Sequence, residues 1–184
     1  MNFDEETVNL QKAGSGRKLP SLQEMAKITA AGLDQAATSV ALALFNDKTY
    51  IQLIGLNGMP QLEQDRILNE LILAGITVIM LMLDAPDLRI SRDFKEYVRI
   101  LKDEIPQAHL TQLKELGIEK NHVKLWKKLI EMRYDEYAQD RLKARSAAME
   151  YDSRKKDLTS KDLDDIHLFL PAFTVAVGCH HHIC

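Results

Sequence analysis

The residues best suited to chemistry lie together in the last seven positions of the sequence, GCHHHIC. Thiolate and imidazole groups are the ligands that zinc prefers, and this stretch supplies five of them within six positions. On a continuous helix, His180 and Cys184 share one face, whereas Cys179 and His182 share another, so one helix offers two ligands to an ion. If Gly178 ends the helix, three or four of these groups can turn toward one ion. The preferred interpretation is a partly packed, partly exposed chain end, and the alternative is a zinc site at Cys179, His180, His182 and Cys184.

Two further acid and histidine pairs have a spacing that is used in di-iron helical bundles. Glu119 precedes His122 by three residues, and Asp164 precedes His167 by three. In such bundles, the pairs face each other across the core. Here each pair is expected in the first turn of its helix, so antiparallel packing would place the two pairs at opposite ends. Acids in a first turn are better explained by the positive end of the helix dipole.

The sequence offers no other template for catalysis. The stretches GSG and GLNG lack the glycine spacing and the following lysine of a phosphate-binding loop. A nucleophilic pair of cysteine and histidine can be drawn at the chain end, but the sequence shows no group to orient it and no oxyanion donor. The protein is therefore predicted to be non-enzymatic.

Composition limits the class of protein. The chain has 184 residues, of which 46% are hydrophobic, enough to bury a core without disulfides or metal. A net charge of -3 gives no general attraction to nucleic acid or to an anionic membrane surface. Two cysteines close together are not a disulfide framework, and the first residues lack the order of a signal peptide. The sequence predicts a reduced, cytoplasmic protein that binds neither nucleic acid nor membrane.

The expected organisation is a flexible leader over 1–19 and a single helical domain over 20–184. The first helix is expected to begin at Ser21, because Glu24 stands at capping-box spacing from it. Repeated alanines along this helix would let a neighbouring helix approach closely. Another helix is expected to begin at Ser91. Pro106 either kinks it or lies in the first turn of a new helix that runs to Gly117, a plausible cap.

The region from 50 to 83 allows two interpretations. One is a helix from Pro60 to Leu83, which is amphipathic at first and then apolar on every side, as expected for an enclosed helix. The other is an α+β fold with a small sheet near 50–56, 76–83 and 173–177, where β-branched residues gather. We prefer the helix, because so few strands would form only a marginal sheet. The apolar run over 71–83 is shorter than the roughly 20 residues that span a membrane.

The strongest helical periodicity covers residues 119–152, which would form a helix about 50 Å long. Trp126 lies on its apolar stripe and is expected to be largely buried. The second half is predicted to contact another protein chain, since it mixes aromatic, methionine and arginine side chains as interface cores do; its apolar members are Tyr134, Tyr137, Leu142, Met149 and Tyr151. The charged residues of this helix alternate in sign, as on a solvated surface.

The sequence as a whole predicts a mostly α-helical bundle of about five helices. The favoured function is a non-enzymatic protein–protein interaction module, acting as an adaptor or as a subunit of a larger cytosolic assembly. Its partner, or a second copy, would bind through the long helix over 119–152. The alternative function is a metal-binding or redox-sensing protein that uses the cysteines and histidines of the chain end, with zinc as the metal.

Overall fold

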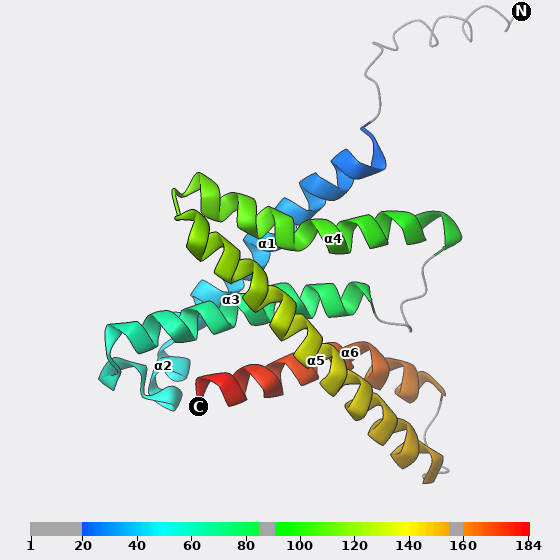
Figure 1. The fold of residues 1–184 in the computed structure, drawn as a ribbon. Helices are drawn as coiled ribbons and strands as arrows, with labels where there is room; N and C mark the ends of the chain where they lie inside the picture. Colours follow the sequence, from blue (N-terminus) through cyan, green and yellow to red (C-terminus); the bar gives the residue numbers. More distant parts are fainter. Residues whose placement is uncertain (1–19, 85–90, 155–159) are drawn as a thin grey trace, which may run out of the picture.

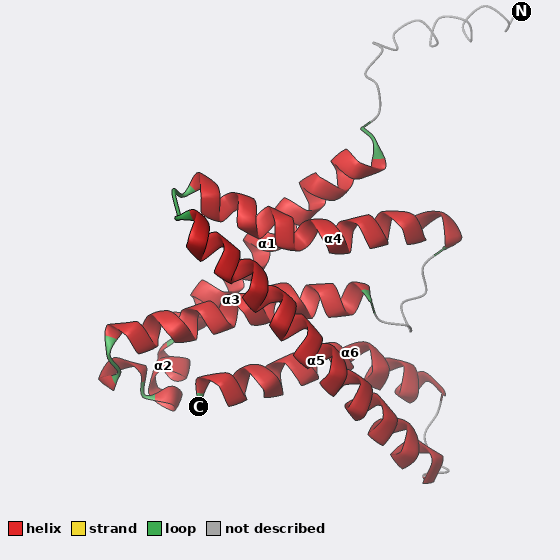
Figure 2. Cartoon of the chain, in the orientation of Figure 1, coloured by secondary structure: helices red, strands yellow, loops and turns green. Residues whose placement is uncertain are grey.

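The computed structural model describes residues 20–84, 91–154 and 160–184, with side chains except at 92–93, 148–154 and 160–169. The predicted leader over 1–19 lies outside these residues. Six α-helices and one 3₁₀ turn make up the described chain (Figures 1 and 2): α1 Leu22–Phe45, α2 Lys48–Ile54, η1 Leu56–Gly58, α3 Gln61–Leu83, α4 Arg92–Glu115, α5 Lys120–Arg154 and α6 Ser160–Ile183. The prediction of a mostly helical bundle is confirmed.

The alternative small sheet is wrong for all three segments. The first forms α2 and the 3₁₀ turn, the second lies in α3, and the third lies in α6. Local signals explain the additional short helix: the Asp47 side chain accepts a hydrogen bond from the backbone N–H of Tyr50 at 2.9 Å, and Gly55 ends the helix in the left-handed conformation at φ 69°. These caps outweigh the strand preference of the β-branched and aromatic residues between them.

Helix α1 begins as its sequence predicts and packs closely on its neighbours. Ser21 and Glu24 form the complete capping box. The alanine face is buried against α3 and α4, at Ala26, Ala30, Ala37 and Ala41. On α3, a Cβ at Gly75 would lie 3.1 Å from the Cβ of Ala37. Small side chains on both helices therefore set the short distance between them.

Helix α3 occupies the centre of the fold, because α1, α4, α5 and α6 all pack on it (Figure 1). Its second half is buried on several sides, at Leu73, Ile76, Met80 and Leu81. This enclosure explains why the sequence over 76–83 lacks a polar face. The helix through Gly75 is confirmed.

Helices α4 and α5 are joined by a tight turn at Gly117, whose φ of 79° confirms the predicted cap. Pro106 lies inside α4, and α5 has 35 residues, a length of about 52 Å. Trp126 is partly buried and packs against the main core, in line with the expectation that it is largely buried. Its indole lies at the edge of the main core, 4.8 Å from the ring of His109.

Two of the described helices, α1 and α3, are long and apolar enough to cross a membrane, judged by length and composition alone. The apolar run over 71–83 continues a helix that starts at Gln61, which supplies the length that the run itself lacks. In the fold, 44% of the apolar window of α3 is buried, against 22% for α1. Core helices of globular proteins meet the same criteria, so this is weak evidence for a span. The absence of membrane binding stays a prediction.

Candidate functional site

Helix α6 continues through Gly178 to Ile183, so the break that would gather four zinc ligands does not occur. A side chain at Gly178 would overlap the buried ring of Tyr137 on α5. The glycine therefore serves close packing between two helices and does not end α6. Pro171 lies within the same helix.

The four predicted zinc ligands separate into different environments. His180 and Cys184 form a pair, with Nδ1 3.5 Å from Sγ. The buried Cys179 thiol donates to the backbone carbonyl of Glu70 at 3.8 Å, and Nε2 of His182 lies 2.9 Å from Oε1 of Glu136. Within the described part of the chain, no group of three or more histidine, cysteine, aspartate or glutamate residues could hold a metal ion. Zinc binding stays a prediction, and it requires the last turns of α6 to unwind.

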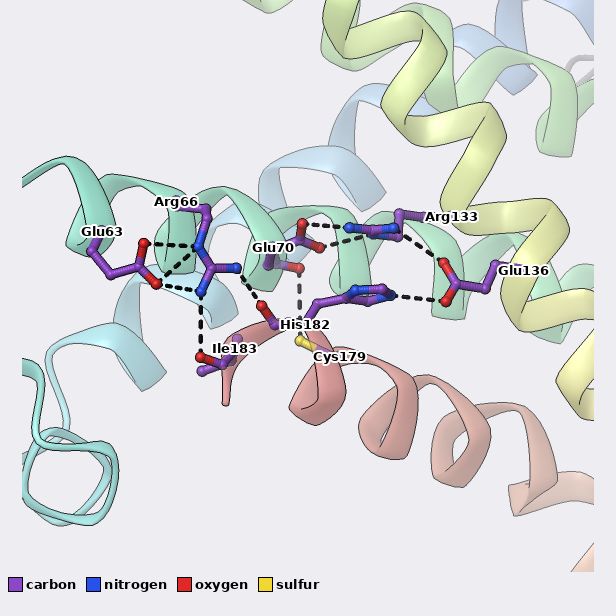
Figure 3. Close-up of polar contacts among 8 residues, drawn as sticks. All are labelled: Glu63, Arg66, Glu70, Arg133, Glu136, Cys179, His182 and Ile183. Carbon is purple, nitrogen blue, oxygen red and sulfur yellow. Dashed lines mark hydrogen bonds and ion pairs between the residues drawn. The ribbon is translucent and has the colours of Figure 1, made fainter.

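The end of α6 is held by an arginine from α3 (Figure 3). Arg66 pairs with Glu63 on its own helix and donates hydrogen bonds to the backbone carbonyls of His182 and Ile183. The last carbonyls of a helix lack partners within the helix and carry its negative dipole end. A guanidinium at this place therefore satisfies two of them and offsets the dipole.

A second arginine connects α3, α5 and α6 (Figure 3). Arg133 donates two hydrogen bonds to Glu70, at 3.0 and 2.7 Å, and a third to Glu136 at 3.1 Å; Glu136 in turn contacts His182. The Arg133 and Glu70 side chains are only 12% and 10% exposed. The hydrogen bonds to Glu70 raise the pKa of Arg133, an effect that burial opposes and the charges of Glu70 and Glu136 reinforce. The guanidinium therefore stays charged and fixes α6 against the other two helices.

An apolar pocket lies beside this network, between α1, α2 and α6, with α3 as its floor. Its volume is about 520 Å³. The lining contains small and branched apolar residues from all four helices: Ala37, Val40, Ala41, Leu44, Leu53, Ile54, Leu71, Ala74, Gly75, Val78, Ala172, Val175, Ala176 and Ile183. Only four lining side chains carry a polar atom, namely Tyr50, Cys179, His180 and Cys184. The pocket thus combines an extended apolar lining with a few polar groups near the end of α6.

The polar groups of the pocket differ in their protonation and their access to solvent. Burial, followed by the nearby Cys179 and Cys184, raises the pKa of Tyr50 to about 12, and its hydroxyl has no hydrogen-bond partner among the described residues. Burial, followed by Glu70, raises the pKa of Cys179 to about 11. At neutral pH, the buried Tyr50 hydroxyl therefore keeps its proton and Cys179 is a neutral thiol. Cys184 is exposed.

The acid and histidine pairs that resemble a di-iron motif do not form a site in the described structure. The Glu119 and His122 side chains are both exposed, with Oε2 3.9 Å from Nδ1. The side chains of Asp164 and His167 lie outside the described residues. Sequence reasoning did not find a buried pair elsewhere: Nδ1 of His109 lies 2.9 Å from Oδ1 of Asp34, between α1 and α4.

Sequence reasoning also missed the pocket and the buried ion pair. A usable signal existed for the pair, because Glu70 immediately precedes an apolar run and is expected to need a cationic partner when buried. The pocket had no such signal, since it depends on the spacing between α1 and α6. Comparisons of the chain with protein-family models, curated proteins and solved structures gave no match. The functional interpretation therefore rests on the geometry of this region.

Proposed function

We propose that the protein is a non-enzymatic binding module that holds a single long apolar chain, such as a fatty acyl chain, in the pocket between α1, α2, α3 and α6. The supporting observation is the pocket itself, about 520 Å³ in volume and lined almost entirely by apolar side chains. Pockets for small molecules typically enclose roughly 300–1,000 Å³ and have mostly apolar walls with a few polar groups. The pocket fits this pattern.

The dimensions favour a slender ligand over a helix from a protein partner. The lining follows α6 from Ala172 to Cys184, a length of about 18 Å at the helical rise. A helix with its side chains is roughly 10 Å wide, so a segment of that length would occupy about 1,400 Å³. An extended hydrocarbon chain is much thinner than such a segment and needs far less room.

The polar side chains suit the head of such a ligand. The hydroxyl of Tyr50 is neutral, buried and without a described partner, so a shift of the side chains that cover it would let it donate to a carboxylate or carbonyl oxygen. A buried hydroxyl without a partner is unfavourable, and a ligand that accepts its hydrogen bond removes that cost. Tyr50 would therefore orient the ligand with its head toward the end of α6.

Calorimetric titration with palmitate tests the proposal. We expect saturable binding with one site per chain and a negative heat capacity change, because apolar surface is buried. Ala176→Phe should weaken binding at least tenfold by filling the pocket from α6. Ala36→Phe is the matched control, since Ala36 is also an exposed helical alanine but does not line the pocket. Absence of saturable binding, or equal binding by both variants, would contradict the proposal.

The protein–protein interaction predicted from the sequence is a second proposal. The surface proposed for it lies in the first half of α5 and not in the second half. Tyr137 is fully buried inside the fold, so it does not belong to an interface, and the side chains of Met149 and Tyr151 lie outside the described residues. Leu125 and Met132 are 52% and 48% exposed, and their seven-residue spacing places them on one face of α5. We propose that a second copy of the chain covers this face. Light scattering should show a dimer, and Leu125→Lys with Met132→Lys should give a monomer.

A further inference from the structure

The only exposed thiol in the described chain belongs to Cys184, and it differs from Cys179 in its exposure and in its hydrogen-bond partner. Cys184 lies at the edge of the apolar pocket, and its Sγ is 3.5 Å from Nδ1 of His180, one turn earlier on the same helix. Cys179 is buried, and its thiol faces the Glu70 carbonyl. A thiol beside an imidazole that can accept its proton is a potential nucleophile.

We propose that Cys184 is a site of S-acylation, at which an acyl group from a long-chain acyl-coenzyme A becomes attached as a thioester while its hydrocarbon chain occupies the apolar pocket. This inference rests on the proposed function, because the pocket positions the chain. The combination of a thiol, a neighbouring imidazole and an apolar cavity lined by both carries the proposal. The proposal gives a chemical role to the cysteine and histidine at the chain end, for which the sequence alone showed no group that would orient them.

The reaction is an exchange between two thioesters. His180, in the tautomer with Nδ1 unprotonated, accepts the thiol proton of Cys184, and the thiolate attacks the acyl carbon. The bond from Sγ to the acyl carbon forms, and the bond from that carbon to the coenzyme A sulfur breaks. The proton on His180 passes to the departing coenzyme A thiolate. Nothing is oxidised or reduced.

The remaining groups of the pocket support this step. The Tyr50 hydroxyl is buried without a described partner, so once the side chains that cover it shift, it becomes a donor for the acyl carbonyl oxygen, where negative charge develops during attack. Apolar residues from α1 and α3, including Ala41, Leu71 and Val78, offer an apolar surface to the hydrocarbon chain. The expected specificity is therefore for chain length, because a short acyl group gains nothing from the pocket.

The test uses the full chain, palmitoyl-coenzyme A below its micelle concentration, and intact-mass spectrometry. We expect the mass to rise by one palmitoyl group, and neutral hydroxylamine to remove it, as for a thioester. Cys184→Ser should abolish the product, whereas His181→Ala, a change at an exposed histidine that does not line the pocket, should keep it. His180→Ala should slow the reaction about 100-fold, the lower end of the usual contribution of a general base. Acetyl-coenzyme A should react much more slowly than the palmitoyl compound.

Each other outcome has a distinct meaning. Palmitate binding without acylation would overturn the S-acylation and leave the proposed function intact. Equal rates with acetyl- and palmitoyl-coenzyme A, or no effect of Ala176→Phe on the palmitoyl reaction, would show ordinary thiol reactivity and overturn the inference. An unchanged rate in His180→Ala would overturn the pairing with the imidazole. If neither palmitate binding nor acylation occurs, both proposals fail.

Discussion

Gly178 on α6 lies directly against the ring of Tyr137 on α5, with no room for a side chain between them. The contact joins two helices through the smallest and one of the largest residues of the fold. It explains why the glycine occurs inside a helix, where glycine costs about 1 kcal/mol relative to alanine. Close packing on a fully buried tyrosine outweighs that cost.

Replacing this glycine should destabilise the protein even though alanine is the better helix former. We expect Gly178→Ala to lower the free energy of unfolding by about 1–3 kcal/mol, the usual cost of overpacking. Gly32→Ala is the matched control, because Gly32 is inside α1 and, apart from its own helix backbone and chain neighbours, no described atom lies within 4 Å of the added Cβ. That change should stabilise by roughly 0.5–1 kcal/mol. Urea denaturation measures both, and a gain in stability for Gly178→Ala would contradict the packing.

Tyr137 should behave as a core residue and not as an interface residue. Its hydroxyl is buried without a partner in the described structure, so Tyr137→Phe should leave the stability unchanged or raise it slightly. Tyr137→Ala should cost about 3–5 kcal/mol. Thermal unfolding and light scattering distinguish the two roles. If Tyr137→Ala changes the association state and leaves the stability unchanged, Tyr137 is an interface residue and not a core residue.

The ion pair of Arg133 and Glu70 should respond strongly to the loss of one partner. Arg133→Met leaves the Glu70 carboxylate buried without its cation and should cost about 3–5 kcal/mol. Replacing both, with Arg133→Met and Glu70→Leu, should recover most of that loss. The exposed pair of Lys143 and Asp140, at 2.8 Å, provides the control, and Lys143→Met should cost less than about 1 kcal/mol. Equal effects at the two pairs would show that burial is unimportant.

Asp84 should contribute a component of stability that depends on pH. Burial raises the pKa of its carboxyl, but hydrogen bonds from Tyr134 at 2.8 Å and Lys102 at 3.1 Å outweigh burial and lower the pKa overall. Because the folded pKa lies below the unfolded value of about 3.9, the contribution is present above that value and is lost as pH falls through the folded pKa.

Comparison of Asp84→Asn with the parent chain in urea measures this component. The variant should be less stable at pH 6, and the difference should shrink steadily as the pH falls below 4. Tyr134→Phe removes one donor and should show part of the same effect. A constant difference between pH 6 and pH 3 would mean that the carboxylate charge contributes nothing.

Much of the fold could be predicted because its signals are local. The capping box at Ser21, the alanine face of α1 and the glycine at 117 each depend on residues within one or two turns. The helix through Gly75 required a judgement about its surroundings, because only enclosure by other helices explains a segment with no polar face. The short helix α2 was missed, since two caps at its ends outweighed the composition between them.

The site was harder to predict because its contacts join distant parts of the chain. His180 and Cys184 were correctly placed on one face, and Cys179 and His182 on another, by helical geometry alone. The packing role of Gly178 was not predicted, since its neighbour Tyr137 lies on a different helix, and the helix break that a zinc site would need does not occur. The pocket depends on the space between α1 and α6, which no local pattern in the sequence records.

The fastening of α6 by Arg66 and Arg133 also affects how the protein assembles and opens. Arg66 and His182 are 116 positions apart in the chain, so their contact closes a very long loop and is expected to form late in folding. Segments attached by such late contacts often open as separate cooperative units, visible as faster amide hydrogen exchange. Because α6 forms one wall of the pocket, its detachment would remove the pocket. Any ligand held there would slow exchange along the whole helix, making α6 a reporter of occupancy.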